Sequence, residues 1–164
     1  MLVLTPLTLE RDADIALPRL SAPAWQGVPM NNVARSGGEL ARRMGIEVLE
    51  ITPQLGRARM PVAGNTQPYG LLHGGASVLL AESIGSLAAN AHAGAEQAAL
   101  GLEVSATHHR AVSEGHVHAE ARALHLGRRV ASYDITISDD EGRRVCTARL
   151  TCMMVPRPDT PRRD

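Results

Sequence analysis

Aromatic residues are almost missing from this chain of 164 residues. Phenylalanine does not occur, and the aromatic side chains are those of Trp25, Tyr69 and Tyr133. Proteins that stack single-stranded nucleic acid use aromatic platforms, so this scarcity excludes that class of binding protein. The core must be built from Leu, Val, Ile, Ala and Met, and a hydrophobic fraction of 44% is enough for a globular domain.

Neither sign of charge is in excess, and long apolar runs are missing. Lys+Arg and Asp+Glu each number 17, which gives a formal net charge of zero. A dedicated nucleic-acid binder carries a basic excess, so we expect no nucleic-acid partner. No apolar run reaches the roughly 18 residues of a membrane-spanning helix. The N-terminal segment lacks a basic start and soon meets Glu10, Arg11 and Asp12, so it does not resemble a signal peptide.

Cysteine is also scarce. Cys146 and Cys152 lie six residues apart in a segment of alternating polarity. In a strand they would share one face about 20 Å apart, whereas a disulfide requires Cα atoms within about 7 Å. We therefore expect two buried, unpaired thiols, which suit a reducing cytoplasm.

The length and the positions of proline indicate one domain with two flanking segments. Residues 1–30 contain Pro6, Pro18, Pro23 and Pro29 and are expected to form an arm. Residues 31–155 form the domain. Residues 156–164 (PRPDTPRRD) are rich in proline and charge, and we expect a disordered tail.

The apolar pattern predicts one long helix and several strands. Residues 74–93 contain no proline and repeat small or apolar side chains at helical spacing, while residues 31–44 are weakly helical. Alternation predicts strands over 46–51, 56–62, 100–107, 116–124, 129–138 and 145–155. In each of the last three strands the small or apolar side chains share one face, namely Val117, Ala119, Ala121 and Ala123; Ala131, Tyr133, Ile135 and Ile137; and Cys146, Ala148, Leu150 and Cys152. One helix cannot supply the crossovers of a parallel sheet. The prediction is an α+β fold in which an antiparallel sheet of five or six strands wraps a single helix.

Glu82 is an isolated acid in the middle of the predicted helix. Its neighbours one turn away are Val78, Leu79, Gly85 and Ser86, so no Lys or Arg is placed to pair with it on the helix surface. Burying an ionised carboxylate is costly unless something compensates its charge. We therefore expect Glu82 to lie in apolar surroundings and to have a function there.

The start of the same helix has the composition of an anion-binding site. His73-Gly74-Gly75 places glycines where a ligand can approach the backbone closely. The first N–H groups of a helix have no internal partner and carry the positive end of the helix dipole. Such donors form an oxyanion hole when they face a carbonyl oxygen that becomes negative during acyl transfer.

The spacing of these two features predicts a site shared between chains. Gly74 and Glu82 are eight residues apart, or about 12 Å along a helix. Reacting atoms must lie about 3–3.5 Å apart, so Glu82 cannot act on a carbonyl held at the start of its own helix. A second, antiparallel copy of the helix closes the gap. We therefore expect a homodimer in which one chain supplies His73 and Gly74 and the other supplies Glu82 and Ser86.

The segment from Gln67 to Ser86, QPYGLLHGGASVLLAESIGS, closely resembles the hotdog-fold acyl-CoA thioesterases. The similarity is to the branch of 4-hydroxybenzoyl-CoA, phenylacetate-pathway and 1,4-dihydroxy-2-naphthoyl-CoA thioesterases. It continues through Gly101-Leu102-Glu103, Thr107-His108 and Leu124-His125-Leu126-Gly127-Arg128-Arg129, and covers residues 32 to 155.

This resemblance implies thioester hydrolysis without a metal or a cofactor, since coenzyme A is part of the substrate. Glu82 would be the catalytic carboxylate, acting as nucleophile or as general base, and the Gly74 N–H would stabilise the oxyanion. Gln67 and His73 would position the thioester. The remaining expected roles belong to Ser86 and His108, which would assist from the partner chain, and to Arg110, Arg128 and Arg129, which would bind the phosphates of coenzyme A. Such families usually form dimers of dimers, so a homotetramer is expected.

Three alternatives carry less support. A zinc hydrolase would use His108, His109, His116 and His118, but no cysteine or carboxylate pattern completes a ligand set. A non-catalytic acyl-CoA-binding module on the same fold is the second alternative, because fold alone does not fix function. A hydratase on this fold is the third, and it would require a different acid–base pair.

Overall fold

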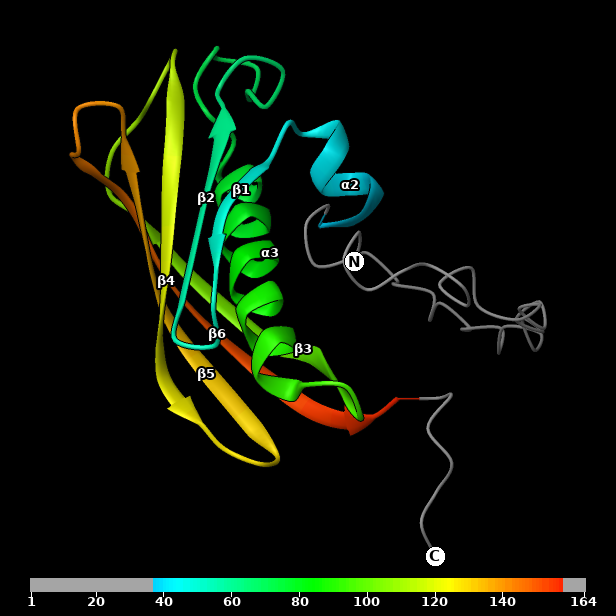
Figure 1. The fold of residues 1–164 in the computed structure, drawn as a ribbon. Helices are drawn as coiled ribbons and strands as arrows, with labels where there is room; N and C mark the ends of the chain where they lie inside the picture. The colour runs from blue at the N-terminus through cyan, green and yellow to red at the C-terminus, as the bar shows by residue number, and fades with distance from the viewer. Residues whose placement is uncertain (1–36, 158–164) are drawn as a thin grey trace, which may run out of the picture.

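The computed structural model describes residues 37–157 of the chain. Two helices lie in this range, α2 (Gly38–Arg43) and α3 (Gly74–Ala93). The strands of this range are β1 (Glu47–Ile51), β2 (Leu55–Pro61), β3 (Gln97–His108), β4 (His116–Leu126), β5 (Val130–Asp139) and β6 (Arg144–Pro156). They form an antiparallel sheet in the order β1-β2-β4-β5-β6-β3, which curves around α3 (Figure 1). The predicted α+β architecture is confirmed.

α3 has the limits that the apolar pattern predicted, and small side chains let the sheet approach it closely. A Cβ on Gly85 would lie 2.6 Å from the Leu150 side chain of β6, so this position accepts only glycine without rearrangement. Gly94 ends the helix with a φ of 71°, a conformation that favours glycine. None of the helices in residues 37–157 is long and apolar enough to cross a membrane.

The inner face of the sheet carries the core. On β5 the buried residues alternate as predicted and are Ala131, Tyr133, Ile135 and Ile137. On β6 the same alternation buries Cys146, Ala148, Leu150 and Cys152. Both cysteines are free, and burial raises the pKa of each thiol. Side chains on the two faces of a strand alternate, which is why the sequence pattern identified the core side correctly.

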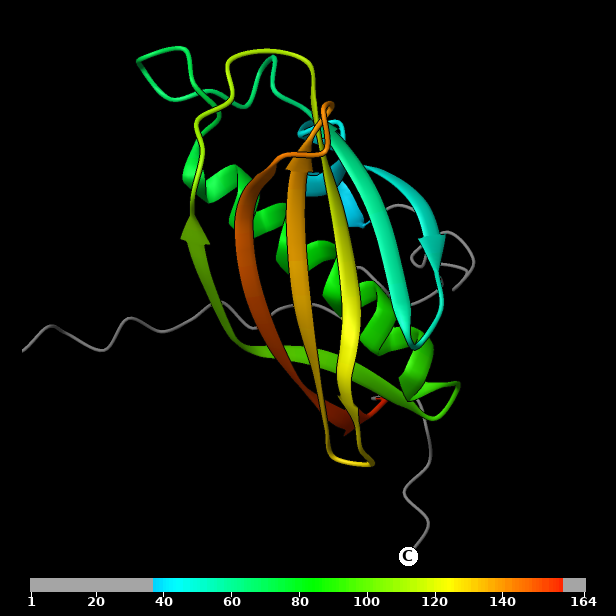
Figure 2. The ribbon, with the colours of Figure 1, turned by 90° about the vertical axis from the view of Figure 1, so that its left-hand side faces the viewer.

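β3 forms one edge of the sheet and pairs with β6 alone within residues 37–157. A β-bulge between Gly101 and Glu103 disturbs its pairing, and Figure 2 shows the strand bending across the end of the sheet. Leu100 and Leu102 are 53% and 56% exposed on this strand. An exposed apolar edge strand is a template for pairing with another chain.

The chain ends lie mostly outside the described residues. The predicted arm of residues 1–30, with Trp25, belongs to that part, and so do residues 158–164 of the predicted tail. Pro156 belongs to β6, and the Arg157 guanidinium donates to the carbonyl oxygens of Gln97 and Gly94. The folded domain therefore extends two residues past the boundary at residue 155.

The buried hydroxyl of Tyr133 makes the free energy of unfolding decrease at alkaline pH. Its hydroxyl donates to the Pro53 carbonyl oxygen at 2.9 Å, and burial, with a smaller effect of Cys152, raises the pKa of Tyr133 to about 12. An unfolded tyrosine ionises near pH 10. The folded state keeps its proton longer, so stability present below pH 10 is lost as the pH rises towards 12, by about 2 kcal/mol.

A Tyr133→Phe variant isolates this effect, because the chain contains no lysine and both proteins retain the two cysteines. The variant loses one hydrogen bond, worth about 1 kcal/mol, at neutral pH. Urea unfolding at several pH values is expected to show that its remaining stability falls less steeply above pH 10 than that of the wild type. Parallel curves for the two proteins would contradict the assignment.

Candidate active site

The first turn of α3 leaves one backbone donor without a partner. The side chain of His73, the N-cap residue, accepts a hydrogen bond at Nδ1 from the Gly75 N–H at 2.8 Å. The His73 carbonyl oxygen accepts from the N–H groups of Ala76 and Ser77. The Gly74 N–H has no acceptor among residues 37–157. It lies at the positive end of the helix dipole, so it is available to an oxygen atom of a ligand.

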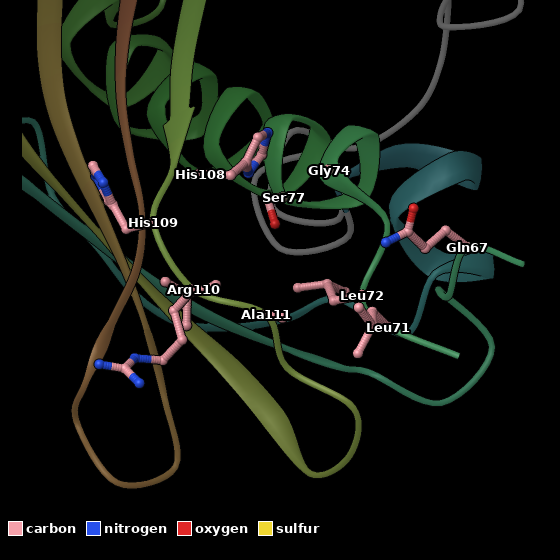
Figure 3. Close-up of a pocket in the computed structure, with 10 residues that line it drawn as sticks. Gln67, Leu71, Leu72, Gly74, Ser77, His108, His109, Arg110 and Ala111 are labelled. Atoms are coloured by element: carbon pink, nitrogen blue, oxygen red, sulfur yellow. The ribbon is translucent and has the colours of Figure 1, made fainter. Parts of the chain in front are cut away.

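This donor borders a pocket of about 380 Å³. The lining residues are Gln67, Leu71, Leu72, Gly74, Ser77, His108, His109, Arg110, Ala111 and Val145 (Figure 3). A Cβ on Gly74 would lie 2.9 Å from Nε2 of His108, so glycine allows the imidazole to lie against the helix start. The pocket therefore combines an apolar wall, a backbone donor and basic side chains.

The loop before α3 is anchored by a buried asparagine. The Asn65 side-chain amide donates to the carbonyl oxygens of Met44 and Pro61, each at 2.9 Å. The backbone carbonyl oxygen of Asn65 accepts from the His73 N–H at 2.9 Å. These bonds fix the loop to the helix start, and Gln67, two residues further along, lines the pocket.

Glu82 lies two turns further along α3, at the edge of the sheet. The expectation that its own chain buries this residue is wrong, because Glu82 is exposed while the adjacent Ala81 and the nearby Ile84 turn to the core. Its carboxylate lies beside β3, where a Cβ on Gly101 would be 3.3 Å from Oε1. β3 is an edge strand of the sheet formed by residues 37–157, so the carboxylate lies beside that edge strand.

Ser86 follows Glu82 by one turn of α3. The Ser86 hydroxyl is 4.0 Å from Sγ of Cys152. Burial raises the pKa of the Cys152 thiol, and the charge of Glu82 raises it further. Cys152 is also the β6 residue opposite Gly101. Glu82, Ser86, Gly101 and Cys152 therefore form one group at the β3 edge.

Within one chain, this group and the pocket at the helix start are separate. Gly74 and Glu82 are both on α3, about 12 Å apart along its axis. His108 was expected to assist together with Ser86 from the partner chain, but the structure places it against Gly74 of its own chain. The reason is that β3 follows α3 after a short turn, runs back along it and ends at the helix start.

The arginines predicted to bind phosphate lie at opposite ends of the domain. Arg110 lines the pocket, whereas Arg128 and Arg129 occupy the turn between β4 and β5. That turn lies at the other end of α3, where Nε2 of His92 hydrogen-bonds the Gly127 carbonyl oxygen at 3.1 Å. A helix of 20 residues is about 30 Å long, so one chain brings Arg110 alone to its pocket.

The four histidines of the zinc alternative do not converge. His109 hydrogen-bonds Thr147, and His118 hydrogen-bonds Asp140 at 2.7 Å, while His108 lies against Gly74. Among residues 37–157, no group of three or more His, Cys, Asp or Glu side chains is arranged to hold a metal ion. This arrangement gives the zinc alternative no ligand set in the described part of the chain.

Sequence reasoning missed Asn65 and Ser77 and gave Gly101 no role of its own. A signal for Ser77 was present, since it precedes Leu80 by three residues and Ala81 by four and so falls on the buried side of the helix. The contact between Gly101 and Glu82 has no signal in the sequence, because it depends on how β3 packs against α3.

A long helix wrapped by an antiparallel sheet, with an unpaired N–H at the helix start and a carboxylate further along, defines a hotdog-fold thioesterase. The sequence model of the thioesterase superfamily matches residues 69–146, and the chain belongs to this family. The protein is accordingly a thioester hydrolase.

Individual relatives agree with this membership. The proofreading thioesterase EntH of Cronobacter turicensis is 48% identical over 119 residues, which cover 72% of this chain and 87% of that protein. A thioesterase from Haemophilus influenzae has a similar solved structure, with a TM-score of 0.71, 35% identity, and coverage of 76% of this chain and 88% of that one. The solved structure of a variant of a thioesterase from Pseudomonas aeruginosa has a TM-score of 0.70 and 38% identity. The match covers 84% of this chain and 97% of that one. The resemblance to hotdog-fold acyl-CoA thioesterases is confirmed.

Proposed function

We propose that this protein hydrolyses acyl-CoA thioesters, with aryl-CoA as the substrate class, to the free acid and coenzyme A. The observation that supports this most is the Gly74 N–H, which has no partner among residues 37–157 and borders a pocket with an apolar wall. A pocket of about 380 Å³ is of the size that binds small molecules. Coenzyme A is part of the substrate, and the proposed reaction uses no further cofactor and no metal.

In the proposed mechanism the thioester carbonyl oxygen accepts a hydrogen bond from the Gly74 N–H. This donor stabilises the negative charge that develops on the oxygen in the transition state. Gln67 and His73 position the thioester. Because Nδ1 of His73 accepts from Gly75, a neutral His73 carries its proton on Nε2 and has that N–H to donate.

Glu82 supplies the carboxylate by one of two routes. It attacks the carbonyl carbon, expels the thiolate of coenzyme A and forms an anhydride that water then hydrolyses. Alternatively it takes a proton from the water that attacks the carbonyl carbon, and the thiolate leaves with a proton. Both routes consume one water molecule and yield one acid and one thiol. Ser86 assists by orienting the carboxylate or the water.

The proposed active unit is a homodimer with two shared sites. Glu82 is exposed and lies beside the edge strand β3, and Leu100 and Leu102 are exposed on that strand. A second copy that pairs its β3 with this edge would cover both leucines and enclose the carboxylate. In this dimer the two α3 helices run antiparallel, and Glu82 of one chain must lie beside Gly74 of the other. The twofold axis therefore crosses α3 at Val78, which is midway between these two residues.

The same reasoning locates the axis on β3. Gly101 lies beside Glu82 and His108 lies beside Gly74, so the axis crosses the strand between them, near Val104 and Ser105. Two such dimers would form the proposed homotetramer. In that assembly Arg110 binds coenzyme A phosphates at its own pocket, while Arg128 and Arg129 act from another subunit. The two unpaired thiols favour the cytoplasm as its compartment.

Release of free thiol from a panel of acyl-CoA thioesters tests the proposal. Aryl thioesters are expected to be hydrolysed more efficiently than medium-chain aliphatic ones, and EDTA is expected to leave the rate unchanged. If no thioester in the panel releases thiol, the proposed function is wrong. Inhibition by EDTA that zinc reverses would favour the metal-dependent alternative.

Gly101 offers a probe of the Glu82 carboxylate. Glu82 Oε1 is the one described heavy atom that a methyl group at residue 101 would meet within 4 Å, apart from its chain neighbours. We expect Gly101→Ala to displace the carboxylate by a few tenths of an ångström and to lower kcat about fivefold. Steady-state kinetics should show a smaller change in KM.

Repeating the Gly101→Ala substitution in a Glu82→Asp variant separates displacement of the carboxylate from damage to strand β3. In Glu82→Asp the shorter side chain withdraws from residue 101, so adding Gly101→Ala is expected to cause little further loss. An equal loss in both backgrounds, or a change in mass by light scattering, would show that Gly101 serves the strand rather than the carboxylate.

A further inference from the structure

Ser77 is a buried polar residue to which the proposed mechanism assigns no role. It lies on α3 three residues after Gly74, and 1% of its surface is exposed. It is also one of the residues that line the pocket. Figure 3 shows its hydroxyl oxygen directed into the pocket, in the space between His108 and Leu72.

The hydroxyl has no hydrogen-bond partner among residues 37–157. No fully buried side-chain oxygen or nitrogen of the described residues lacks a partner, so this hydroxyl is open to the pocket, and serine is a poorer helix former than alanine. Alanine occupies the buried positions 76 and 81 of the same helix and would fit equally well at residue 77. Folding therefore gives no reason for a serine at this position, whereas a ligand in the pocket does.

We propose that the Ser77 hydroxyl hydrogen-bonds a polar substituent on the acyl group of the bound thioester, and so determines which acyl groups are preferred. This inference rests on the proposed function, because it takes the thioester carbonyl to be held by Gly74. Positions three residues apart on a helix are about 5–6 Å apart. If the thioester carbonyl oxygen is bound at Gly74, a substituent of the acyl group about 5 Å from that oxygen is within reach of the Ser77 hydroxyl.

The surroundings of Ser77 favour the acyl group over the coenzyme A arm. Leu72, Ala111 and Val145 are apolar and line the same pocket. The basic residues suited to phosphate lie apart from it, since Figure 3 shows His109 and Arg110 directed away from Ser77. The coenzyme A end of the substrate thus belongs on the basic side, and the acyl end belongs beside Ser77.

The test compares Ser77→Ala with the wild type on benzoyl-CoA and on the 2-, 3- and 4-hydroxybenzoyl-CoA thioesters. For the hydroxybenzoyl isomer that the wild type prefers, kcat/KM is expected to fall about tenfold in the variant, which is the size of one neutral hydrogen bond. Benzoyl-CoA is expected to change less than about twofold. Ser83→Ala, on the same helix and outside the pocket lining, is the matched control and should leave both values unchanged.

Binding measurements separate this inference from the proposed function. Phenacyl-CoA and its hydroxylated forms are thioethers that cannot be hydrolysed at sulfur, and calorimetry reports their Kd without turnover. Weaker binding of a hydroxyphenacyl-CoA to Ser77→Ala, with phenacyl-CoA unchanged, supports the inference even if no thioester is hydrolysed. Equally weakened binding of every ligand would place the Ser77 contact on the coenzyme A arm and overturn the assignment to the acyl group. An unchanged Kd for every ligand would also overturn it.

The melting temperature of the free protein gives an independent readout. Ser77→Ala and Ser83→Ala are both expected to raise Tm slightly, because both gain the helix propensity of alanine. A lower Tm in Ser77→Ala, with activity reduced equally for all substrates, would show a structural role and overturn the proposal.

Discussion

Replacing Gly74 by proline is expected to lower kcat for thioester hydrolysis at least about a hundredfold, the cost of losing one oxyanion-hole donor. Gly74 is the first residue of α3, where proline is tolerated because the helix does not use that N–H. His73 has φ −70° and ψ 131°, the extended conformation that a residue before proline prefers. The substitution therefore removes the donor and leaves the helix start compatible with its backbone.

Gly74→Ala is the matched control for this variant. Both substitutions add a Cβ close to Nε2 of His108, at 2.9 Å before any adjustment, but alanine retains the N–H. The ratio of the two kcat values therefore measures the donor rather than the crowding of the imidazole. Equal kcat values for the two folded variants would show that the Gly74 N–H does not stabilise the transition state.

Glu82→Gln is expected to lower turnover at least about a hundredfold, the scale for losing a base or nucleophile. Glutamine has nearly the shape of glutamate but lacks its charge and basicity. Because Glu82 is exposed in the single chain and makes no hydrogen bond or ion pair with residues 37–157, the melting temperature should stay close to that of the wild type. Turnover near the wild-type rate would remove Glu82 from the proposed mechanism.

Mixing the two inactive variants tests whether the site is shared. In a heterodimer of Glu82→Gln and Gly74→Pro chains, one site combines the intact Gly74 of the first chain with the intact Glu82 of the second. Random exchange makes about half of the dimers heterodimers, with one intact site of two, so activity should recover to about a quarter of the wild-type value.

The controls for this experiment are the separate variants, carried through the same exchange of subunits. Each should remain at its own low rate. If the mixture gives the mean rate of the separate variants although exchange is shown by mass, then Gly74 and Glu82 act within one chain. The 12 Å that separate them along α3 would then have to be spanned in another way.

Much of the fold was predictable because it depends on local patterns. The proline-free repeat of small and apolar residues predicted where α3 begins and ends, and Gly94 follows its last residue as the C-cap. Alternation identified the buried sides of β4, β5 and β6 because one face of each packs on the helix. β3 was predicted three residues short at its start, since its exposed leucines and its bulge break the alternation of a half-buried strand.

The candidate site was predictable as chemistry but not as geometry. Glu82 and the His73-Gly74-Gly75 segment attracted attention through residue type and spacing alone. The exposure of Glu82 was not predictable, because an apolar helix can turn an acid either to a core or to the open edge of a sheet. The position of His108 depended on where β3 ends, and sequence spacing carries no such information.

The sequence alone determined the helix, the faces of the central strands and the residue types available for acyl transfer, because each follows from neighbours within a few positions. Only the tertiary structure decided which N–H of the first turn lacks a partner, that His108 meets Gly74 and that Gly101 meets Glu82. Those contacts join residues 34 and 19 positions apart (108 − 74 and 101 − 82). They are set by strand register and by the packing of β3 on α3, which no local pattern encodes.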